Sequence, residues 1–274
     1  MVLFLYSNKE VEYQAIACIK SLEVKITDDV TIVYYTVGFK SEFECKNLVK
    51  VEMDYLDYPT FHYYKADLSL KTMDLFPNEN HFLFTDTDVL FSRRFDFNKL
   101  KFDNSYPRAS FGPHEYPFIY SEENGKRVIY NETALMDYFN VKGRSCRYVW
   151  TCFYSFNRNC VDFLEEWVSI LHNKYLMKDR KIYHPMHDEQ AFNICLWKRS
   201  AVDMLGYVFL NTHNINIIKK VEMDNNIKGV YGDNIDMFGA NWEYIHDSSD
   251  IILYHGVKEP SDVNLALDYL LSVR

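Results

Sequence analysis

Two aspartates one residue apart, Asp86 and Asp88, are the side chains of this sequence best suited to do chemistry. They follow the mostly apolar run Phe82–Thr85 and precede the apolar run Val89–Phe91. Residues two apart on a strand share a face of the sheet, and α/β proteins bind ligands beyond the carboxyl ends of their strands. Neighbouring carboxylates repel each other unless a cation lies between them, and Mg²⁺ or Mn²⁺ shared with substrate phosphates is the usual solution. The pair therefore indicates a metal and diphosphate site.

A second group of candidate ligands, His255, Gly256 and Lys258, follows the apolar residues 251–254 near the end of the sequence. An imidazole can complete the shell of a Mn²⁺ ion, and a glycine lets the backbone approach a ligand closely. An ammonium group can neutralise the charge of a departing diphosphate. Taken with the two aspartates, this segment predicts a third metal ligand and a cation for the diphosphate.

Two further segments carry charged side chains that could act on the same substrate. Asp188 and Glu189 lie at the start of a predicted helix. Acids at this position also stabilise the positive end of a helix, and that structural interpretation stays open. Either acid could instead hydrogen-bond the sugar or act as general base on an acceptor hydroxyl, with Asp188 the first choice. Lys65 could reach the substrate that donates the sugar. The ordinary alternative is that Lys65 is exposed to solvent, as lysines on helices usually are.

The elements that would position these side chains alternate in the first part of the chain. Strands are predicted over Val2–Tyr6, Val30–Val37, Leu48–Met53 and His81–Thr85, and helices over Glu10–Leu22 and Tyr63–Leu75. In the first helix, Val11, Ile16, Ile19 and Leu22 are expected to face the core. Alternation of strands and helices predicts a mainly parallel sheet flanked by helices.

Periodicity fades between residues 91 and 148, and a stretch of this length without clear elements is usually functional, either as loops that face an acceptor or as a mobile lid. It returns with a predicted strand over Tyr148–Phe156 and a predicted helix over Val161–Leu176. Neither a repeat nor a clear linker interrupts the chain. We therefore expect one domain over residues 1–274.

The composition is that of an ordinary globular protein. Its 274 residues are 48% hydrophobic and 25% charged, and the formal net charge of −9 argues against broad attraction to nucleic acid or anionic membranes. Its six cysteines form no C-x-x-C pair, which is typical of reduced thiols, and the segment Met1–Tyr6 is too short for a secretory signal. A cytoplasmic protein without membrane insertion is expected.

The order of these motifs resembles the GT-A glycosyltransferases, nearest to their glycogenin-like, family 8 type members. The resemblance is carried by the strand leading into Asp86-Thr87-Asp88, the later strand around Trp150-Thr151-Cys152, the segment His187-Asp188-Glu189-Gln190 and the terminal His255-Gly256-Val257-Lys258. It implies a GT-A fold, in which a Rossmann-like central sheet is joined by a smaller acceptor-side subregion. By this resemblance, residues 1–90 would form a nucleotide-sugar-binding half and residues 91–274 an acceptor-side half.

The resemblance also implies a function and roles for individual residues. The donor would be a nucleoside-diphosphate sugar, and the reaction a hexosyl or pentosyl transfer to an acceptor hydroxyl. Mn²⁺ or Mg²⁺ would be held by Asp86, Asp88 and His255. Lys258, with Thr87 and Gly256, would serve the diphosphate, Tyr6 and Ser7 would lie beside the nucleoside, Lys65 would face the donor, and Asp188 or Glu189 would face the sugar or acceptor.

Two other functions stay open from the sequence. Four apolar or small residues followed by Asp-x-Asp also describe haloacid-dehalogenase-type phosphatases, in which Asp86 would attack phosphorus and Asp88 would act as acid and base. A noncatalytic glycan-binding protein could use the aspartates for a structural cation. For a transferase, the acceptor could be a glycan, a protein or a modified nucleic acid, and the donor sugar, nucleotide base, stereochemistry and oligomeric state are not determined by the sequence.

Overall fold

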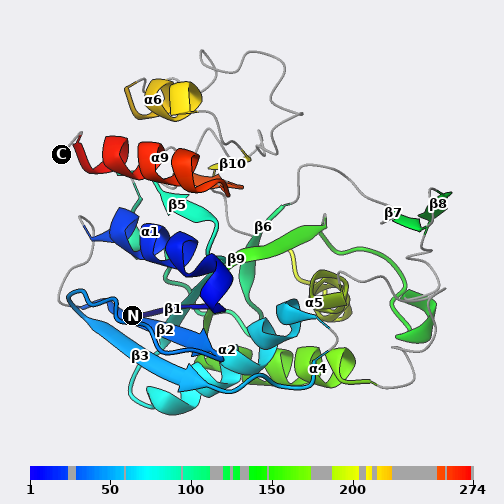
Figure 1. Ribbon diagram of the computed structural model, residues 1–274. Helices are drawn as coiled ribbons and strands as arrows, with labels where there is room; N and C mark the ends of the chain where they lie inside the picture. Colours follow the sequence, from blue (N-terminus) through cyan, green and yellow to red (C-terminus); the bar gives the residue numbers. More distant parts are fainter. Residues whose placement is uncertain are drawn as a thin grey trace.

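A six-stranded sheet forms the centre of the protein (Figure 1). The computed structural model describes residues 1–23, 29–58, 60–93, 95–111, 120–123, 126–129, 136–146, 148–173, 187–203, 208–211, 215–223, 252–256 and 258–272. The strand order is β3-β2-β1-β4-β9-β6. These strands are β1 (Val2–Ser7), β2 (Thr31–Val37), β3 (Leu48–Met53), β4 (His81–Thr85), β6 (Arg108–Phe111) and β9 (Val149–Asn157). Strands β1 to β4 are mutually parallel, whereas β9 is antiparallel to both β4 and β6.

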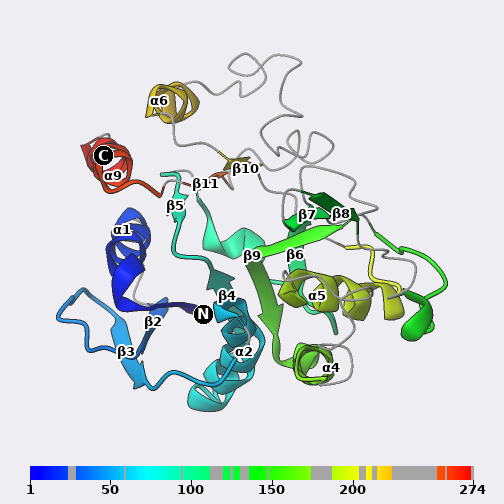
Figure 2. The ribbon, with the colours of Figure 1, turned by 45° about the vertical axis from the view of Figure 1, so that its right-hand side comes forward.

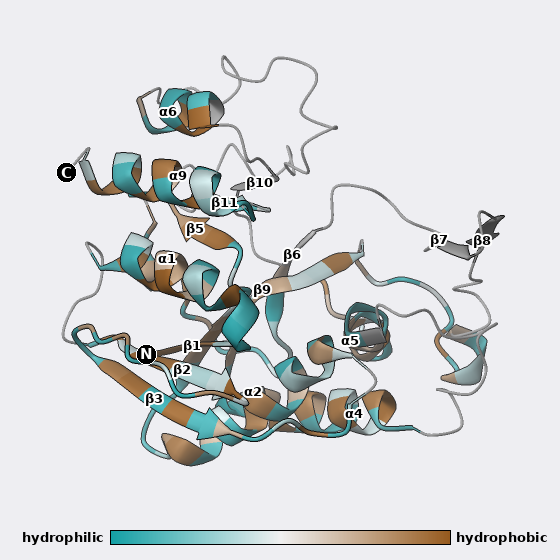
Figure 3. Ribbon diagram, viewed as in Figure 1, coloured by the Kyte–Doolittle hydropathy of each residue, from teal (hydrophilic) through white to brown (hydrophobic). Residues whose placement is uncertain are grey.

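Strand β1 is apolar along nearly its whole length because both faces of the sheet are covered. Its six residues are all buried, as expected for a central strand of a parallel sheet. Phe4 and Tyr6 point into one hydrophobic cluster, and Leu3 and Leu5 point into another. Strand β3 lies at the sheet edge instead, and Figure 3 shows hydrophobic and hydrophilic residues mixed along it.

Helices cover the two faces of the sheet. Helix α1 (Glu12–Leu22) contributes to the cluster that contains Leu3 and Leu5. Helices α2 (Tyr64–Leu75), α4 (Val161–Leu171) and α5 (His187–Lys198) contribute to the cluster on the opposite face. Figure 2 shows α1 apart from these three helices, with α4 and α5 side by side. Short 3₁₀ helices in the described part of the chain span Lys9–Val11, Phe61–Tyr63, Phe97–Leu100 and Arg158–Cys160.

A smaller unit near the end of the chain packs against α1. It contains a three-stranded sheet in the order β10-β11-β5, formed by β10 (Val208–Asn211), β11 (Ile252–His255) and β5 (Val89–Phe91). Helices α6 (Ile215–Met223) and α9 (Pro260–Ser272) complete this unit. Figures 1 and 2 both show α9 beside α1. A separate hairpin joins β7 (Tyr120–Glu123) and β8 (Lys126–Ile129). The late strand β11 therefore lies next to β5, the strand that follows the two aspartates.

The predicted α/β class with a mainly parallel sheet is confirmed, and the strand bounds agree to within about one residue. The antiparallel direction of β9 was not predicted, because the direction of a strand is not encoded in its hydrophobic pattern. The core face of α1 was predicted only in part. Val11 and Ile16 are partly exposed, and the small residues Ala15 and Cys18 are buried instead, because they allow close packing on β1.

Two predicted elements extend past the described residues. Residues 174–176 of the predicted helix and Ile251 of the terminal apolar run lie outside the part of the chain that the structure describes. None of the helices that the structure does describe has both the length and the apolar character needed to cross a membrane.

A buried acid fastens α6 to the strand that carries His255. The Glu222 carboxylate accepts a hydrogen bond from the hydroxyl of Tyr254 at 2.7 Å and lies 3.1 Å from Nε of Arg93. Glu222 and Tyr254 are both fully buried. This contact links α6, β11 and the residues after β5.

We predict that Tyr254→Phe lowers the free energy of unfolding by about 1–3 kcal/mol, because the buried carboxylate loses a hydrogen-bond donor. Urea unfolding measures the change. Tyr269→Phe is the matched control, because that hydroxyl donates to the carbonyl of Lys219 on the exposed surface, and its loss should cost less than about 0.5 kcal/mol. Equal effects of the two substitutions would contradict the assigned importance of Glu222.

Candidate active site

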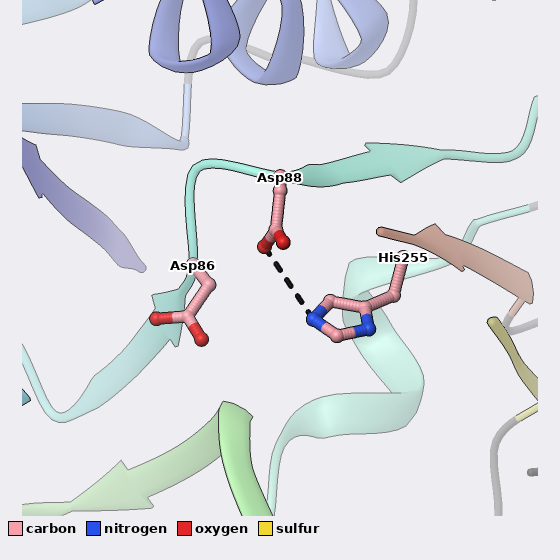
Figure 4. A group of neighbouring side chains, drawn as sticks. All are labelled: Asp86, Asp88 and His255. Carbon is pink, nitrogen blue, oxygen red and sulfur yellow. Dashed lines mark ion pairs between the residues drawn. The ribbon is translucent and has the colours of Figure 1, made fainter. Parts of the chain in front are cut away.

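A turn between two strands brings Asp86 and Asp88 together. Strand β4 ends at Thr85, and the chain turns before β5 begins at Val89. Figure 4 shows Asp86 at the end of β4 and Asp88 at the start of β5, with the carboxylate of Asp88 directed toward the ring of His255. The acids therefore converge because the chain bends, and not because they alternate along one strand as the sequence suggested.

Strand register places His255 beside the aspartates. β11 pairs antiparallel with β5, so that His255 lies opposite Val89, and the amide of Gly256 donates to the carbonyl of Asp88 at 3.1 Å. Gly256 has φ of +82°, a backbone conformation that glycine adopts without strain. Nε2 of His255 lies 3.4 Å from Oδ1 of Asp88. Burial lowers the pKa of His255 although Asp88 opposes this shift, and the neutral imidazole is the form that binds metals.

These three side chains fit a divalent cation. One ligand atom from each of Asp86, Asp88 and His255 lies within 4.8 Å of the other two. Two carboxylate oxygens with one imidazole nitrogen suit Mn²⁺, and the oxygens alone suit Mg²⁺. A cation would also relieve the repulsion between the two carboxylates.

Lys65 supplies a fixed positive charge behind the first aspartate. Its side chain is only 3% exposed, and its ammonium lies 3.2 Å from Oδ2 of Asp86 and 3.3 Å from Oδ2 of Asp188. Burial lowers the pKa of Lys65, but the two carboxylates outweigh it and hold the pKa well above its usual range. The interpretation of Lys65 as a solvated helix lysine is therefore wrong.

The surroundings of Asp86 nevertheless shift its pKa in opposite directions. Burial raises its pKa to about 7, with Asp88 and Asp188 adding to the rise and Lys65 opposing it. A divalent cation at this position would favour the ionised form.

The two acids at the start of α5 differ sharply. Asp188 is buried, and burial alone would raise its pKa, but Lys65, His62 and the Thr151 hydroxyl hold the pKa below its usual range. That hydroxyl donates to Oδ2 of Asp188 at 2.7 Å. Asp188 is thus fully engaged, which leaves it poorly placed to take a proton from an acceptor.

Glu189 is less buried than Asp188, and its pKa is shifted in the opposite direction. Burial, followed by the negative charge of Asp188, raises its pKa to about 8. The hydroxyl of Tyr148 donates to Oε2 of Glu189 at 3.4 Å. At neutral pH this acid is largely protonated, so it can donate a hydrogen bond as well as accept one.

A cavity of about 650 Å³ joins most of the predicted site residues. It is lined by Tyr6, Val11, Gln14, Phe61, His62, Lys65, Asp86, Thr87, Asp88, Tyr148, Trp150, Cys152, Asp188, Glu189, His255 and Lys258. Lys258 is exposed, and its ammonium lies 3.4 Å from Oδ2 of Asp88. Ser7 does not line the cavity, because its buried hydroxyl pairs with that of Tyr34 at 2.6 Å. Gly256 contributes a backbone contact and no lining surface.

Several lining residues were not singled out from the sequence. Gln14 and His62 lie on predicted helices or at their starts, where a polar side chain is normally exposed. Trp150 was noted only as part of a strand, although its ring lies 5.9 Å from that of His255. Their positions depend on which strand ends meet at the cavity, which local patterns do not encode.

Comparison with known proteins identifies the fold. No protein-family model matches the sequence, and a search of curated proteins finds no match. Among solved structures, the chain is similar to WbbM, a bifunctional glycosyltransferase solved in its apo state, with 12% identity and a TM-score of 0.60 over 99% of this chain. The match covers 51% of WbbM, so this chain spans about half the length of that protein.

A second similar structure is a glycosyltransferase involved in the glycosylation of the major capsid of PBCV-1. Its identity to this chain is 10%, its TM-score is 0.50, and the match covers 97% of this chain and 98% of that one. The chain therefore has a fold that is shared with known glycosyltransferases.

The raised pKa of Glu189 predicts a pH-dependent stability. Because its pKa in the folded state (about 8) lies above the ordinary value of 4.5, the native state holds a proton that the unfolded chain releases. The resulting stabilisation is complete below the ordinary pKa and is lost as the pH rises through about 8. Glu189→Gln should flatten the fall in unfolding free energy over this interval, as measured by urea unfolding at several pH values.

Glu165→Gln is the matched control for this measurement, because Glu165 is exposed on α4. It should leave the pH dependence of the wild type unchanged. If the curves for Glu189→Gln and the wild type run parallel from about pH 5 to pH 9, the environment assigned to Glu189 is wrong.

Proposed function

We propose that this chain is a metal-dependent glycosyltransferase of the GT-A class that moves a hexose or pentose from a nucleoside-diphosphate donor to an acceptor hydroxyl. The observation that carries the proposal is the convergence of Asp86, Asp88 and His255 on one side of a cavity that also contains Lys258. The fold shared with WbbM and the PBCV-1 enzyme supports it.

The diphosphate of the donor would lie between the aspartates and Lys258. When bound by Asp86, Asp88 and His255, Mn²⁺ or Mg²⁺ would supply positive charge to the leaving diphosphate. Lys258 supplies a second positive charge from the solvent side, since its side chain is 64% exposed and already lies near Asp88. Lys65 holds Asp86 in place from the opposite, buried side.

The nucleoside would occupy the end of the cavity formed by β1 and α2. Tyr6 stacks on Phe84 with 5.9 Å between ring centroids, and its hydroxyl donates to the carbonyl of Phe61 at 3.1 Å. The ring of Phe61 lies 5.0 Å from that of Tyr6. Because these rings are fixed by their neighbours, they present a rigid apolar wall suited to a flat base.

The acceptor would enter at the opposite end, in the half formed by residues 91–274. β4 lies between β1 and β9, so the strand that carries Tyr6 and the strand that carries Trp150 flank the strand that ends before Asp86. Trp150, Tyr148 and Glu189 all line the cavity, and we place the acceptor beside them. An aromatic surface beside a protonated acid suits an acceptor with both an apolar ring face and hydroxyl groups.

The two acids of α5 take different roles in this arrangement. Asp188 is paired with Lys65 and Thr151, which leaves it poorly placed to act as general base, and the raised pKa of Glu189 favours its protonated form. We therefore assign Asp188 to the positioning of Lys65, and Glu189 to hydrogen bonding with the sugar or acceptor.

A noncatalytic glycan-binding protein is the second candidate, because the same aspartates could hold a structural cation. Donor hydrolysis separates the two functions. Only the enzyme should release nucleoside diphosphate slowly, and in a Mn²⁺-dependent manner, from one member of a nucleotide-sugar panel. The phosphatase alternative has less support, since the fold is that of glycosyltransferases and Asp86 is paired with Lys65.

The first prediction from this proposal concerns the metal. Asp88→Ala should abolish Mn²⁺-dependent hydrolysis and transfer, because the cation loses one of two carboxylate ligands, while the circular dichroism spectrum and unfolding midpoint stay near those of the wild type. Asp74→Asn, which changes an exposed acid on α2, is the control and should keep full activity. Wild-type activity in Asp88→Ala would refute the metal site.

The second prediction concerns the acceptor end. Trp150→Ala should raise the KM for the acceptor by about tenfold through the loss of an aromatic contact, with donor hydrolysis within about twofold of the wild type. Trp150→Phe should recover most of the affinity. The measurement uses the first active acceptor found in a panel of glycans, peptides and nucleosides. An equal loss of donor hydrolysis and transfer would place Trp150 at the donor instead.

A further inference from the structure

Gln14 occupies the point where three segments of the chain meet. It lies in the first half of α1, lines the cavity and is only 7% exposed. Its Oε1 accepts a hydrogen bond from the hydroxyl of Thr87 at 3.4 Å. Its Nε2 donates to the backbone carbonyl of Lys258 at 3.3 Å and to the hydroxyl of Tyr13 at 3.1 Å. The one amide group thus contacts the turn that carries the aspartates and the segment that carries the lysine.

A second side chain of α1 holds the same carbonyl group. The hydroxyl of Tyr13 donates to the carbonyl of Lys258, so two donors from α1 converge on one oxygen. Elsewhere, the amide of Gly256 donates to the carbonyl of Asp88. The backbone on both sides of residue 257 is therefore fixed to α1 and to the aspartate turn.

The environment of Gln14 makes this arrangement specific. Its neighbours Ala15, Ala17 and Cys18 are small, buried residues, so an amide here is a polar group on a largely apolar surface. A buried amide is unfavourable unless its hydrogen-bonding capacity is used. The hydroxyl of Thr87 satisfies the oxygen of the Gln14 amide, and its nitrogen donates both to the carbonyl of Lys258 and to the hydroxyl of Tyr13.

We propose that Gln14 is a positioning residue that couples the Asp86-Thr87-Asp88 turn to Lys258, so that the metal ligands and the diphosphate-binding cation are held as one unit. The inference rests on the proposed function. Gln14 does not contact the metal ligands themselves, and it acts through the Thr87 hydroxyl and the backbone of Lys258. With the carbonyl fixed, the Lys258 ammonium stays 3.4 Å from Asp88, on the side where the diphosphate would bind.

The test measures binding of inorganic pyrophosphate in the presence of Mn²⁺ by isothermal titration calorimetry, with Mn²⁺ alone titrated separately. Gln14→Leu keeps the approximate volume of the side chain and removes both hydrogen bonds to the two segments. It should weaken pyrophosphate binding by about tenfold, as expected for one or two lost neutral hydrogen bonds, and change the affinity for Mn²⁺ alone by less than about twofold. If Gln14 had only a structural role, Gln14→Leu would weaken the binding of Mn²⁺ and of pyrophosphate alike.

A double-mutant cycle identifies the route of the effect. If Gln14 acts through Lys258, Gln14→Leu should cause no further loss of pyrophosphate affinity in a Lys258→Ala background. Additive losses would overturn the proposal. Tyr13→Phe removes the second donor to the carbonyl of Lys258 and one acceptor of the Gln14 amide, and it does so at a partly exposed residue. It should therefore give a smaller loss in the same direction even if Gln14→Leu fails to fold.

Ser21→Ala is the matched control, because the Ser21 hydroxyl also ties α1 to a neighbouring strand, accepting from the amide of Phe91 at 3.0 Å, two turns away from Gln14. It should lower the unfolding midpoint and leave pyrophosphate binding unchanged. The inference fails if the wild type binds Mn²⁺ and pyrophosphate and both Gln14→Leu and Tyr13→Phe bind them equally well. The proposed function fails instead if the wild type binds neither ligand.

Discussion

Repulsion among four carboxylates is the constraint on which the site depends. Asp86, Asp88, Asp188 and Glu189 all line one cavity. The structure reduces the repulsion in three ways: Lys65 lies near both Asp86 and Asp188, the raised pKa of Glu189 favours its protonated form, and the ammonium of Lys258 lies near Asp88. These positive charges do not neutralise the region between Asp86 and Asp88, and we place the proposed cation there. The electrostatics of the cavity therefore support the proposed cation independently of the sequence motif.

The fold meets this constraint by joining two units at the aspartate turn. β4 belongs to the large sheet and β5 to the small one, so Asp86 is anchored to one unit and Asp88 to the other. His255 reaches the turn because β11 pairs with β5. Lys258 follows in the sequence, and its backbone carbonyl accepts hydrogen bonds from Tyr13 and Gln14. A chain segment more than 160 residues away in sequence therefore completes a site that begins in the central sheet.

The sequence predicted the elements of the amino-terminal half well, because each strand and helix there carries its own periodic pattern. The proximity of Asp86, Asp88 and His255 was also expected from the sequence, because all three follow apolar runs typical of strands, and their role as metal ligands stays a prediction. The inward direction of Lys65 was not. Lys65, Ser69 and Thr72 form a buried polar stripe on α2, with Ser69 and Thr72 bonded to the hydroxyls of Tyr154 and Tyr35. A polar stripe at helical spacing normally predicts a solvent-facing surface. It is inverted here because tyrosines of the sheet present hydroxyl groups to the helix. The role of Gln14 was hidden for a similar reason, because its partners are distant in sequence.

The most direct test of the account is anomalous X-ray diffraction from crystals of the protein grown with Mn²⁺ and inorganic pyrophosphate. The account predicts a manganese peak in direct contact with carboxylate oxygens of Asp86 and Asp88 and with Nε2 of His255, and pyrophosphate between that peak and the ammonium of Lys258. A manganese peak elsewhere, with the carboxylates of Asp86 and Asp88 paired only with protein groups, would contradict it.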